Sequence, residues 1–548
     1  MAFASPAGDA YVTTMEETGI APSPRSRGII GDSSALALGT VISRTSGFVR
    51  VLLIPAIFGA TSVGDVFLAA NALPLTVFAM IGGQALGSIL VPVLVRTLEK
   101  NPARAEAIGR SALTMITIAL GSILALGLAF RSTIASGLTL GIADQGDATA
   151  IARILLLFML PQLVLYGYIA FFVAYQQACG KFFLPAVAPT VENLTLIVAM
   201  IAIAVFFGDV HQTTATDTVV LLALGAGSTI ALVLHLVIQA VGAAKAGARL
   251  GFGPLRPPPE LAAQRGQLTS SLGWTMTYGL RIIALIIASG WVGGGGIQAF
   301  QIGFLLQNLP MALIGYPIAA ALLPRLAELP ALSVEIATVY SKVRDLVGWI
   351  LVPIGIGLIV LSAPLGDALS IGRFSSANGP ELIAASIAGL AMSAASEAVY
   401  EIARQTTLAH GRTGAFTRSI WIRGAISAIG IVAAPMLLDG WRLLLALGIV
   451  VSASDLAALY TIDRPLRRLA NRTHSASGAL YKSVAAALIA AVVCLLVGSW
   501  LSVSAPIARL AVLGPCYLVV YLATAAAVTD RGSQVKEIWF SMQRTLSS

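Results

Sequence analysis

Long apolar stretches recur along almost the whole chain, and this recurrence constrains the fold more than any other feature. A window of about 19 residues identifies about fourteen stretches that can each cross a hydrocarbon core of roughly 30 Å. They lie near positions 34–60, 65–95, 107–130, 150–177, 185–207, 217–244, 267–292, 297–324, 337–365, 380–408, 418–437, 441–462, 482–502 and 506–528. Only 11% of the residues are charged, against about 25% in soluble domains. The sequence therefore predicts an all-α polytopic membrane protein.

Basic residues gather in alternate loops between these stretches. With a cytosolic N-terminus, the inner loops hold most lysines and arginines, whereas the outer loops hold only Arg131, Arg153, Arg373 and Arg442. This asymmetry follows the positive-inside rule and predicts that both termini are cytosolic. The formal net charge of +9 is thus explained by membrane orientation, and we expect no nucleic-acid partner.

The loops leave no room for a soluble catalytic domain, since none exceeds roughly 25 residues between predicted spans. The chain contains no phosphate-cradling glycine loop, nucleophile motif or zinc spacing. Cys179, Cys494 and Cys516 are isolated from one another, and His235 is expected to be packed or hydrogen-bonded. We therefore expect a transporter that is not an enzyme and has no cofactor.

Two segments resemble each other in the placement of their prolines. Leu73-Pro74 precedes a small-residue stretch that ends in Pro92, and Leu309-Pro310 precedes one that ends in Pro324. Duplicated halves with proline-interrupted helices in matching places are typical of secondary transporters. Chance likeness in a chain rich in leucine, alanine and glycine is the alternative interpretation.

Arg44 and Arg50 lie inside the first apolar stretch, in the run SRTSGFVR, with no carboxylate at helical spacing. An arginine at mid-bilayer costs about 2.5–3.5 kcal/mol even on insertion scales, and such residues usually line a cavity or substrate path. Because guanidinium groups bind phosphate oxygens in bidentate pairs, both are candidate ligands for an anionic substrate. The alternative is that each side chain snorkels to the nearer membrane interface.

The two arginines are six residues apart, which places them about 120° apart on an ideal helix. A local break at Gly47 would bring both to one cavity, or one of them would pair with Asp65. Asp65 lies near the outer end of the second span, where it also suits the start of a helix. Arg281, in the seventh span, is a further candidate substrate ligand.

Three acidic residues are candidates for a proton or cation site. Glu397 and Glu401 share one helix face with Arg404, a pattern equally typical of a self-neutralising structural cluster. Asp455 is the acid of the predicted twelfth span, and Glu192 in the fifth span receives no role.

Several segments resemble the MurJ/MviN family of lipid II flippases. The likeness covers roughly residues 34–528 and rests on SRTSGFVR, FGATSVGDVFLAANALP, LGSILVPVLV, GKFFLPAVAPTVENLTLI, IGRFSSANGPELIAASIAGL and QTTLAHGRTGAFTRS, in that order. The resemblance implies two six-helix lobes related by a pseudo-twofold repeat, followed by two additional helices, as in the superfamily of multidrug and polysaccharide exporters. The expected organisation is a cytosolic tail (1–30), an N-terminal lobe (31–250), a C-terminal lobe (251–475), two additional helices (476–530) and a cytosolic tail (531–548).

The resemblance also implies an activity: alternating-access transfer of an undecaprenyl-pyrophosphate-linked disaccharide peptide from the inner to the outer leaflet of the bacterial inner membrane. Arg44 and Arg50 match the family's paired first-span arginines, and Asp65 matches its second-span acid. The implied partners are the lipid-linked anionic glycan, the bilayer and other envelope-synthesis proteins. Coupling to the membrane potential or to a monovalent cation is implied as well.

The chain departs from the family pattern in two spans. The second span has Phe78, Ala79 and Gly83 where the family carries charge, and the eighth has Phe304 and Leu305. The alternatives are therefore a flippase for another polyprenyl-linked glycan and a non-transporting paralogue that scaffolds envelope synthesis. A cation-coupled drug exporter would favour an acidic cavity, and the arginines speak against it. A membrane glycosyltransferase would need a carboxylate or metal cluster facing an outer loop, whereas the outer loops are short and nearly free of acidic residues.

Overall fold

The structure is a computed structural model in which every regular element is a helix among the residues it describes. These are residues 28–315, 318 and 334–528, apart from positions 82, 209, 250, 264, 377, 410–412, 471–478 and 502–504. Fourteen helical segments in this part of the chain are long and apolar enough to span a membrane. The predicted all-α class and span number are confirmed.

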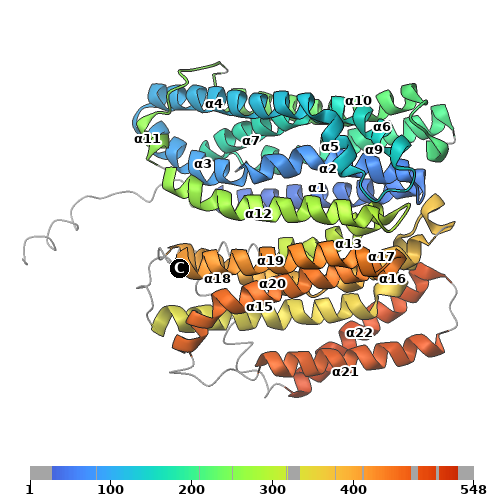
Figure 1. The fold of residues 1–548 in the computed structure, drawn as a ribbon. Coiled ribbons are helices and arrows are strands. Elements are labelled where there is room, and N and C mark those ends of the chain that lie inside the picture. The colour runs from blue at the N-terminus through green and yellow to red at the C-terminus, as the bar shows by residue number, and fades with distance from the viewer. Residues whose placement is uncertain are drawn as a thin grey trace, which may run out of the picture.

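The helices form two lobes and an additional pair (Figure 1). The N-terminal lobe contains α1 (Gly28–Phe58), α2 (Ser62–Met80), α3 (Gly83–Lys100), α4 (Pro102–Ala129), α5 (Arg131–Leu138), α6 (Gln145–Met159), α7 (Gln162–Ala178), α8 (Phe183–Val187), α9 (Pro189–Phe207), η2 (Val210–Gln212) and α10 (Thr218–Lys245). The short α11 (Pro259–Ala262) lies in the connection to the next lobe.

The C-terminal lobe contains α12 (Arg265–Gly290), α13 (Gly296–Pro310), η3 (Met311–Gly315), α15 (Val334–Val360), α16 (Ser362–Leu369), η4 (Gly372–Ser376), α17 (Gly379–Leu390), α18 (Ser393–Ala409), α19 (Thr413–Leu437) and α20 (Gly440–Ala470). The pair α21 (Ala479–Trp500) and α22 (Pro506–Val528) packs on α15 and α16, on the side away from the N-terminal lobe (Figure 1). The twelfth span extends beyond its predicted end, so that it also includes Asp463.

The second span is interrupted, but the interruption does not lie at Pro74. Helix α2 continues through this proline to Met80, and α3 begins at Gly83. A Cβ atom at position 83 would lie 2.4 Å from the Phe78 ring, so any larger residue where the helix resumes would have to displace this ring. In the eighth span α13 ends at Pro310 and continues as one π-helical turn. Pro324, the end of the second repeat, lies outside the described residues.

Helices α1 and α12 join the two lobes. Helix α1 packs on α8 and α9 of its own lobe and on η4 and α13 of the other, while α12 packs on α2, α19 and α20. Leu52 of α1 is buried in a C-terminal core with Phe300 and Phe374. Ile286 and Ile297 are in turn buried in an N-terminal core. Both helices therefore contact elements that would move relative to each other if the lobes moved.

Helices α17 and α20 approach each other so closely that their backbones touch. A Cβ atom at Gly448 would lie 2.6 Å from the carbonyl carbon of Gly389, and one at Gly389 would lie 2.5 Å from the Leu445 oxygen. Only glycine at both positions permits this packing, since neither backbone can yield without moving its helix.

We expect Gly448→Val to destabilise the protein because the added atoms force α17 and α20 apart. Overpacking of this kind costs about 1–3 kcal/mol. The measurement is thermal or denaturant unfolding of the purified protein in detergent. Gly121→Val in α4 is the matched control, because a Cβ there meets nothing within 4 Å. Equal losses of unfolding stability in the two variants would contradict the close-packing explanation.

Candidate functional site

Most of the predicted site residues fall into two polar groups in different lobes. We call Arg281, Ser393, Glu397, Arg423 and Asp455 the C-lobe network. We call Arg50, Glu192, His235, Gln239 and Gln176 the Arg50 chain. Arg44, Asp65 and Glu401 belong to neither group.

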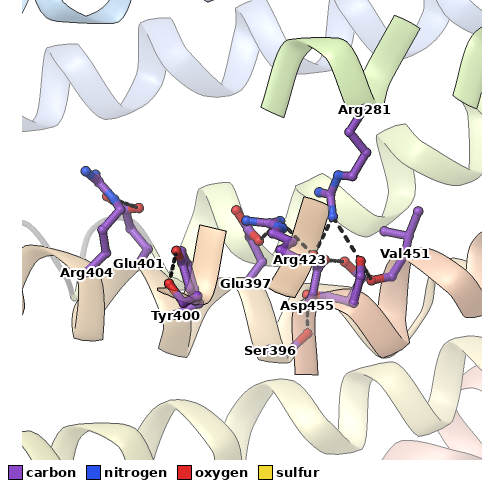
Figure 2. A network of polar contacts seen from close by, with 12 residues as sticks. Arg281, Ser396, Glu397, Tyr400, Glu401, Arg404, Arg423, Val451 and Asp455 are labelled. Carbon is purple, nitrogen blue, oxygen red and sulfur yellow. Dashed lines mark hydrogen bonds and ion pairs between the residues drawn. The ribbon is translucent and has the colours of Figure 1, made fainter. Parts of the chain in front are cut away.

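Asp455 of α20 is the centre of the C-lobe network (Figure 2). Its Oδ1 lies 2.5 Å from Nη1 of Arg281 in α12 and 2.7 Å from Nη2 of Arg423 in α19. Its Oδ2 accepts a hydrogen bond of 2.5 Å from the Ser393 hydroxyl in α18. Arg423 also pairs with Glu397 of α18. One buried carboxylate thereby ties four helices of the lobe together.

Aromatic rings surround the Arg423 guanidinium. Its Cζ lies 4.8 Å from the Trp274 ring centre, 5.3 Å from that of Tyr400 and 5.7 Å from that of Tyr278. Ring faces attract a cation, and the attraction strengthens when the cation is removed from water. Arg423 is only 3% exposed, so the rings and the two carboxylates together compensate the loss of its hydration.

The network is neutral as built, since it holds two arginines and two carboxylates. Glu401 makes a second pair with Arg404, at 2.5 and 2.8 Å. Each acid predicted for cation coupling therefore already has an arginine partner. Among the described residues no group of three or more metal-ligating side chains is close enough to hold an ion.

Arg423 was not among the residues predicted from the sequence. It is an arginine within an apolar run of the eleventh span, SIWIRGAISAIGI. An arginine inside a predicted membrane span indicates a candidate functional residue, by the same reasoning that selected Arg44 and Arg50. No other feature of the sequence points to Arg423.

The Arg50 chain crosses four helices of the N-terminal lobe. Nη1 of Arg50 in α1 lies 3.5 Å from Oε1 of Glu192 in α9. The other Glu192 oxygen lies 2.8 Å from Nδ1 of His235 in α10. Nε2 of His235 lies 3.3 Å from Gln239, which in turn contacts Gln176 of α7 at 2.8 Å. His235 is hydrogen-bonded, as predicted, whereas the Arg50–Glu192 pair was not predicted.

Arg44 is exposed on α1, and no contact to its side chain occurs among the described residues. Helix α1 is continuous through Gly47, so the predicted local break is wrong. The reason is packing: Gly47 faces Asn193 of α9, whose amide donates to Ser46 Oγ at 3.0 Å. Arg44 and Arg50 consequently keep the angular separation of a regular helix.

Asp65 is fully buried and binds the start of another helix. Its carboxylate accepts hydrogen bonds from the backbone N–H groups of Gly295, at 2.8 Å, and of Gln298, at 3.0 Å. These N–H groups lie at the N-terminus of α13, where a negative charge is favoured by the helix dipole. Asp65 therefore links α2 to the C-terminal lobe, and the alternative in which it pairs with an arginine is not what the structure shows.

Comparison with known proteins finds a matching family profile and relatives that carry the same description. The profile of the family described as lipid II flippase MurJ matches residues 54–511. A probable lipid II flippase MurJ from Rhizobium tropici is 29% identical over 335 residues, which cover 59% of this chain and 60% of the relative. The lipid II flippase MurJ of Burkholderia cenocepacia is 26% identical over 295 residues, which cover 53% of this chain and 55% of that relative. The matched region thus spans about 60% or less of these two relatives.

Solved structures share the fold. A lipid II flippase MurJ in an inward closed conformation superposes with a TM-score of 0.69 at 16% identity, covering 90% of this chain and 98% of that one. An inward-facing multidrug resistance MATE family transporter of the MOP superfamily superposes with a TM-score of 0.60 at 13% identity. The superposition covers 79% of this chain and 96% of that one. With the family profile extending over most of the sequence, this chain belongs to the lipid II flippase MurJ family.

Proposed function

We propose that this protein moves a polyprenyl-pyrophosphate-linked cell-wall precursor, lipid II, from the inner to the outer leaflet of the bacterial inner membrane. Arg50 binds the pyrophosphate, and Arg44 on the same helix contributes a second positive charge. The proposal is supported by the family membership and by the relatives, which are named as lipid II flippases.

The main support for this proposal is that Arg50 is partly exposed and only weakly paired. Its side chain is 25% exposed and makes one ion pair among the described residues, to Glu192 at 3.5 Å, which is too long for a strong hydrogen bond. Arg281 and Arg423, in contrast, are buried and bonded at 2.5 and 2.7 Å to Asp455. Most N–H donors of Arg50 therefore have no partner within the described part of the chain and can bind phosphate oxygens.

The contacts of helix α1 with both lobes support a role for this helix in alternating access. A pyrophosphate carries about two negative charges, and bringing it unpaired through hydrocarbon is prohibitively expensive. Pairing with an arginine on a helix between the lobes reduces this cost while the lobes change their relative position. Asp65, which holds α13 to α2, is one of the contacts at the joint between them.

A different lipid-linked glycan is the second candidate cargo. Phe78, Phe304 and Leu305 are apolar where the family carries charge, so contacts to the rest of the substrate differ from the family pattern. The pyrophosphate chemistry at Arg50 is common to both candidates, and the sugar is what distinguishes them.

We expect Arg50→Ala to lower transport at least about tenfold, since one charge-assisted hydrogen bond is worth about 1.5–3 kcal/mol. Arg44→Ala should lower it less, because Arg44 is exposed. The measurement is lipid II on the outer leaflet of cells in which this chain replaces the host flippase. Arg153→Ala, at an exposed arginine bonded to Ser132, is the control. Normal transport by well-expressed Arg50→Ala would contradict the proposal.

The driving force follows from the same charges. An inside-negative potential favours the outward movement of an anion by about 2.3 kcal/mol per charge per 100 mV. The alternative, a monovalent cation bound by Glu397, Glu401 or Asp455, would have to displace an arginine from each. We therefore propose coupling to the membrane potential.

In proteoliposomes, imposing a potential that is negative on the cytosolic face should raise the transport rate several-fold. Replacing sodium by choline at constant potential should leave the rate unchanged. Transport that needs a sodium gradient at zero potential would contradict this proposal without affecting the assignment of the cargo.

A further inference from the structure

The hydrogen bonds of the Arg50 chain all run in one direction, from Gln176 towards Glu192. Nε2 of Gln176 donates to Oε1 of Gln239 at 2.8 Å. The other terminal atom of Gln239, its Nε2, is an amide donor that lies 3.3 Å from His235 Nε2. An imidazole nitrogen that accepts a hydrogen bond carries no proton, so the proton of the neutral ring is on Nδ1.

Nδ1 of His235 consequently donates to Glu192, at 2.8 Å. This leaves Glu192 as an acceptor, the state of an ionised carboxylate, with its second oxygen directed at Arg50. The supporting side chains are buried: Gln176 is 1% exposed, Gln239 0% and His235 6%. The carboxylate is therefore held in place from the interior of the lobe, whereas its contact to Arg50 is at the accessible end.

We propose that Glu192 is a positioning residue for Arg50: it holds the guanidinium while no substrate is bound and is displaced by the substrate pyrophosphate. This inference rests on the proposed function and adds a regulatory step to it. The carboxylate and the pyrophosphate are anions that compete for one guanidinium. The substrate therefore binds less tightly than it would to an unpaired arginine, and the return of Glu192 to Arg50 speeds release.

The geometry favours exchange at this pair over exchange at the Arg281–Asp455 pair. Arg50 and Glu192 are 25% and 16% exposed, and their contact is 3.5 Å long. The Arg281–Asp455 pair is 7% and 0% exposed at 2.5 Å, and breaking it would leave the buried Arg281 guanidinium without its carboxylate partner. A polar ligand can open a pair with a long contact and a solvated edge at low cost.

The test compares Glu192→Gln with the wild type in the full-length purified protein. The amide keeps the shape and the oxygen that accepts from His235, so the lobe should fold normally. We expect the Kd for lipid II to fall about two- to fivefold, the range for a partly exposed ion pair. In proteoliposomes KM and kcat should both fall, because binding tightens and release slows. A merely structural role would lower the unfolding temperature without this joint change.

Two controls identify the cause. Glu106→Gln removes a carboxylate whose partner is Arg249, 3.6 Å away, and should leave Kd unchanged. In an Arg50→Ala background, Glu192→Gln should no longer change Kd, since the two residues act on each other. Equal tightening in that background would mean general charge repulsion and would overturn the proposal, as would an unchanged or larger Kd for Glu192→Gln alone.

A readout without substrate separates this inference from the proposed function. Modification of Arg50 by phenylglyoxal, followed by peptide mass spectrometry, should be several-fold faster in Glu192→Gln. An unchanged rate would overturn the role of Glu192 even if lipid II is transported. If the wild type does not bind lipid II, the proposed cargo fails, while the modification rate still decides whether Glu192 holds Arg50.

Discussion

The cost of removing a charge from water determines how the polar residues of this protein are arranged. Asp455 and Arg423 are almost completely buried, and each would be prohibitively expensive alone in a low-dielectric interior. They are tolerated because Arg281, Glu397 and Ser393 complete a neutral network across α12, α18, α19 and α20. The packing of those four helices in turn depends on the network, because loss of one partner would leave an unpaired charge in the centre of the lobe.

The same principle distinguishes the two lobes. In the C-terminal lobe Arg281 and Arg423 are bonded to the buried Asp455 and lie against aromatic rings, which gives them a structural role. In the N-terminal lobe Arg50 has one long contact to Glu192, and Arg44 has no contact among the described residues. An arginine that is held loosely, on a helix that contacts both lobes, is suited to binding an anion that must later be released. The fold thus separates arginines that stabilise from arginines that are available to a ligand.

Much of the fold was predictable, since apolar stretches long enough to cross a bilayer are a local property of the sequence. The ion pairs were not, because their partners lie far apart in the chain: Arg281 and Asp455 are separated by 174 positions. Helical spacing placed Glu401 near Arg404, as the structure shows, but it carries no information about contacts between helices. For the same reason the sequence does not indicate a role for Glu192. It also does not show that α9 packs against Gly47, where a break in the helix was predicted as one possibility.

The decisive measurement is the structure of the protein with lipid II bound. We expect pyrophosphate oxygens within hydrogen-bonding distance of the Arg50 guanidinium, Arg50 separated from Glu192, and Asp455 still bonded to Arg281 and Arg423. A pyrophosphate bound to Arg281 or Arg423, with the Asp455 pairs broken and Arg50 still on Glu192, would rule out substrate binding at Arg50.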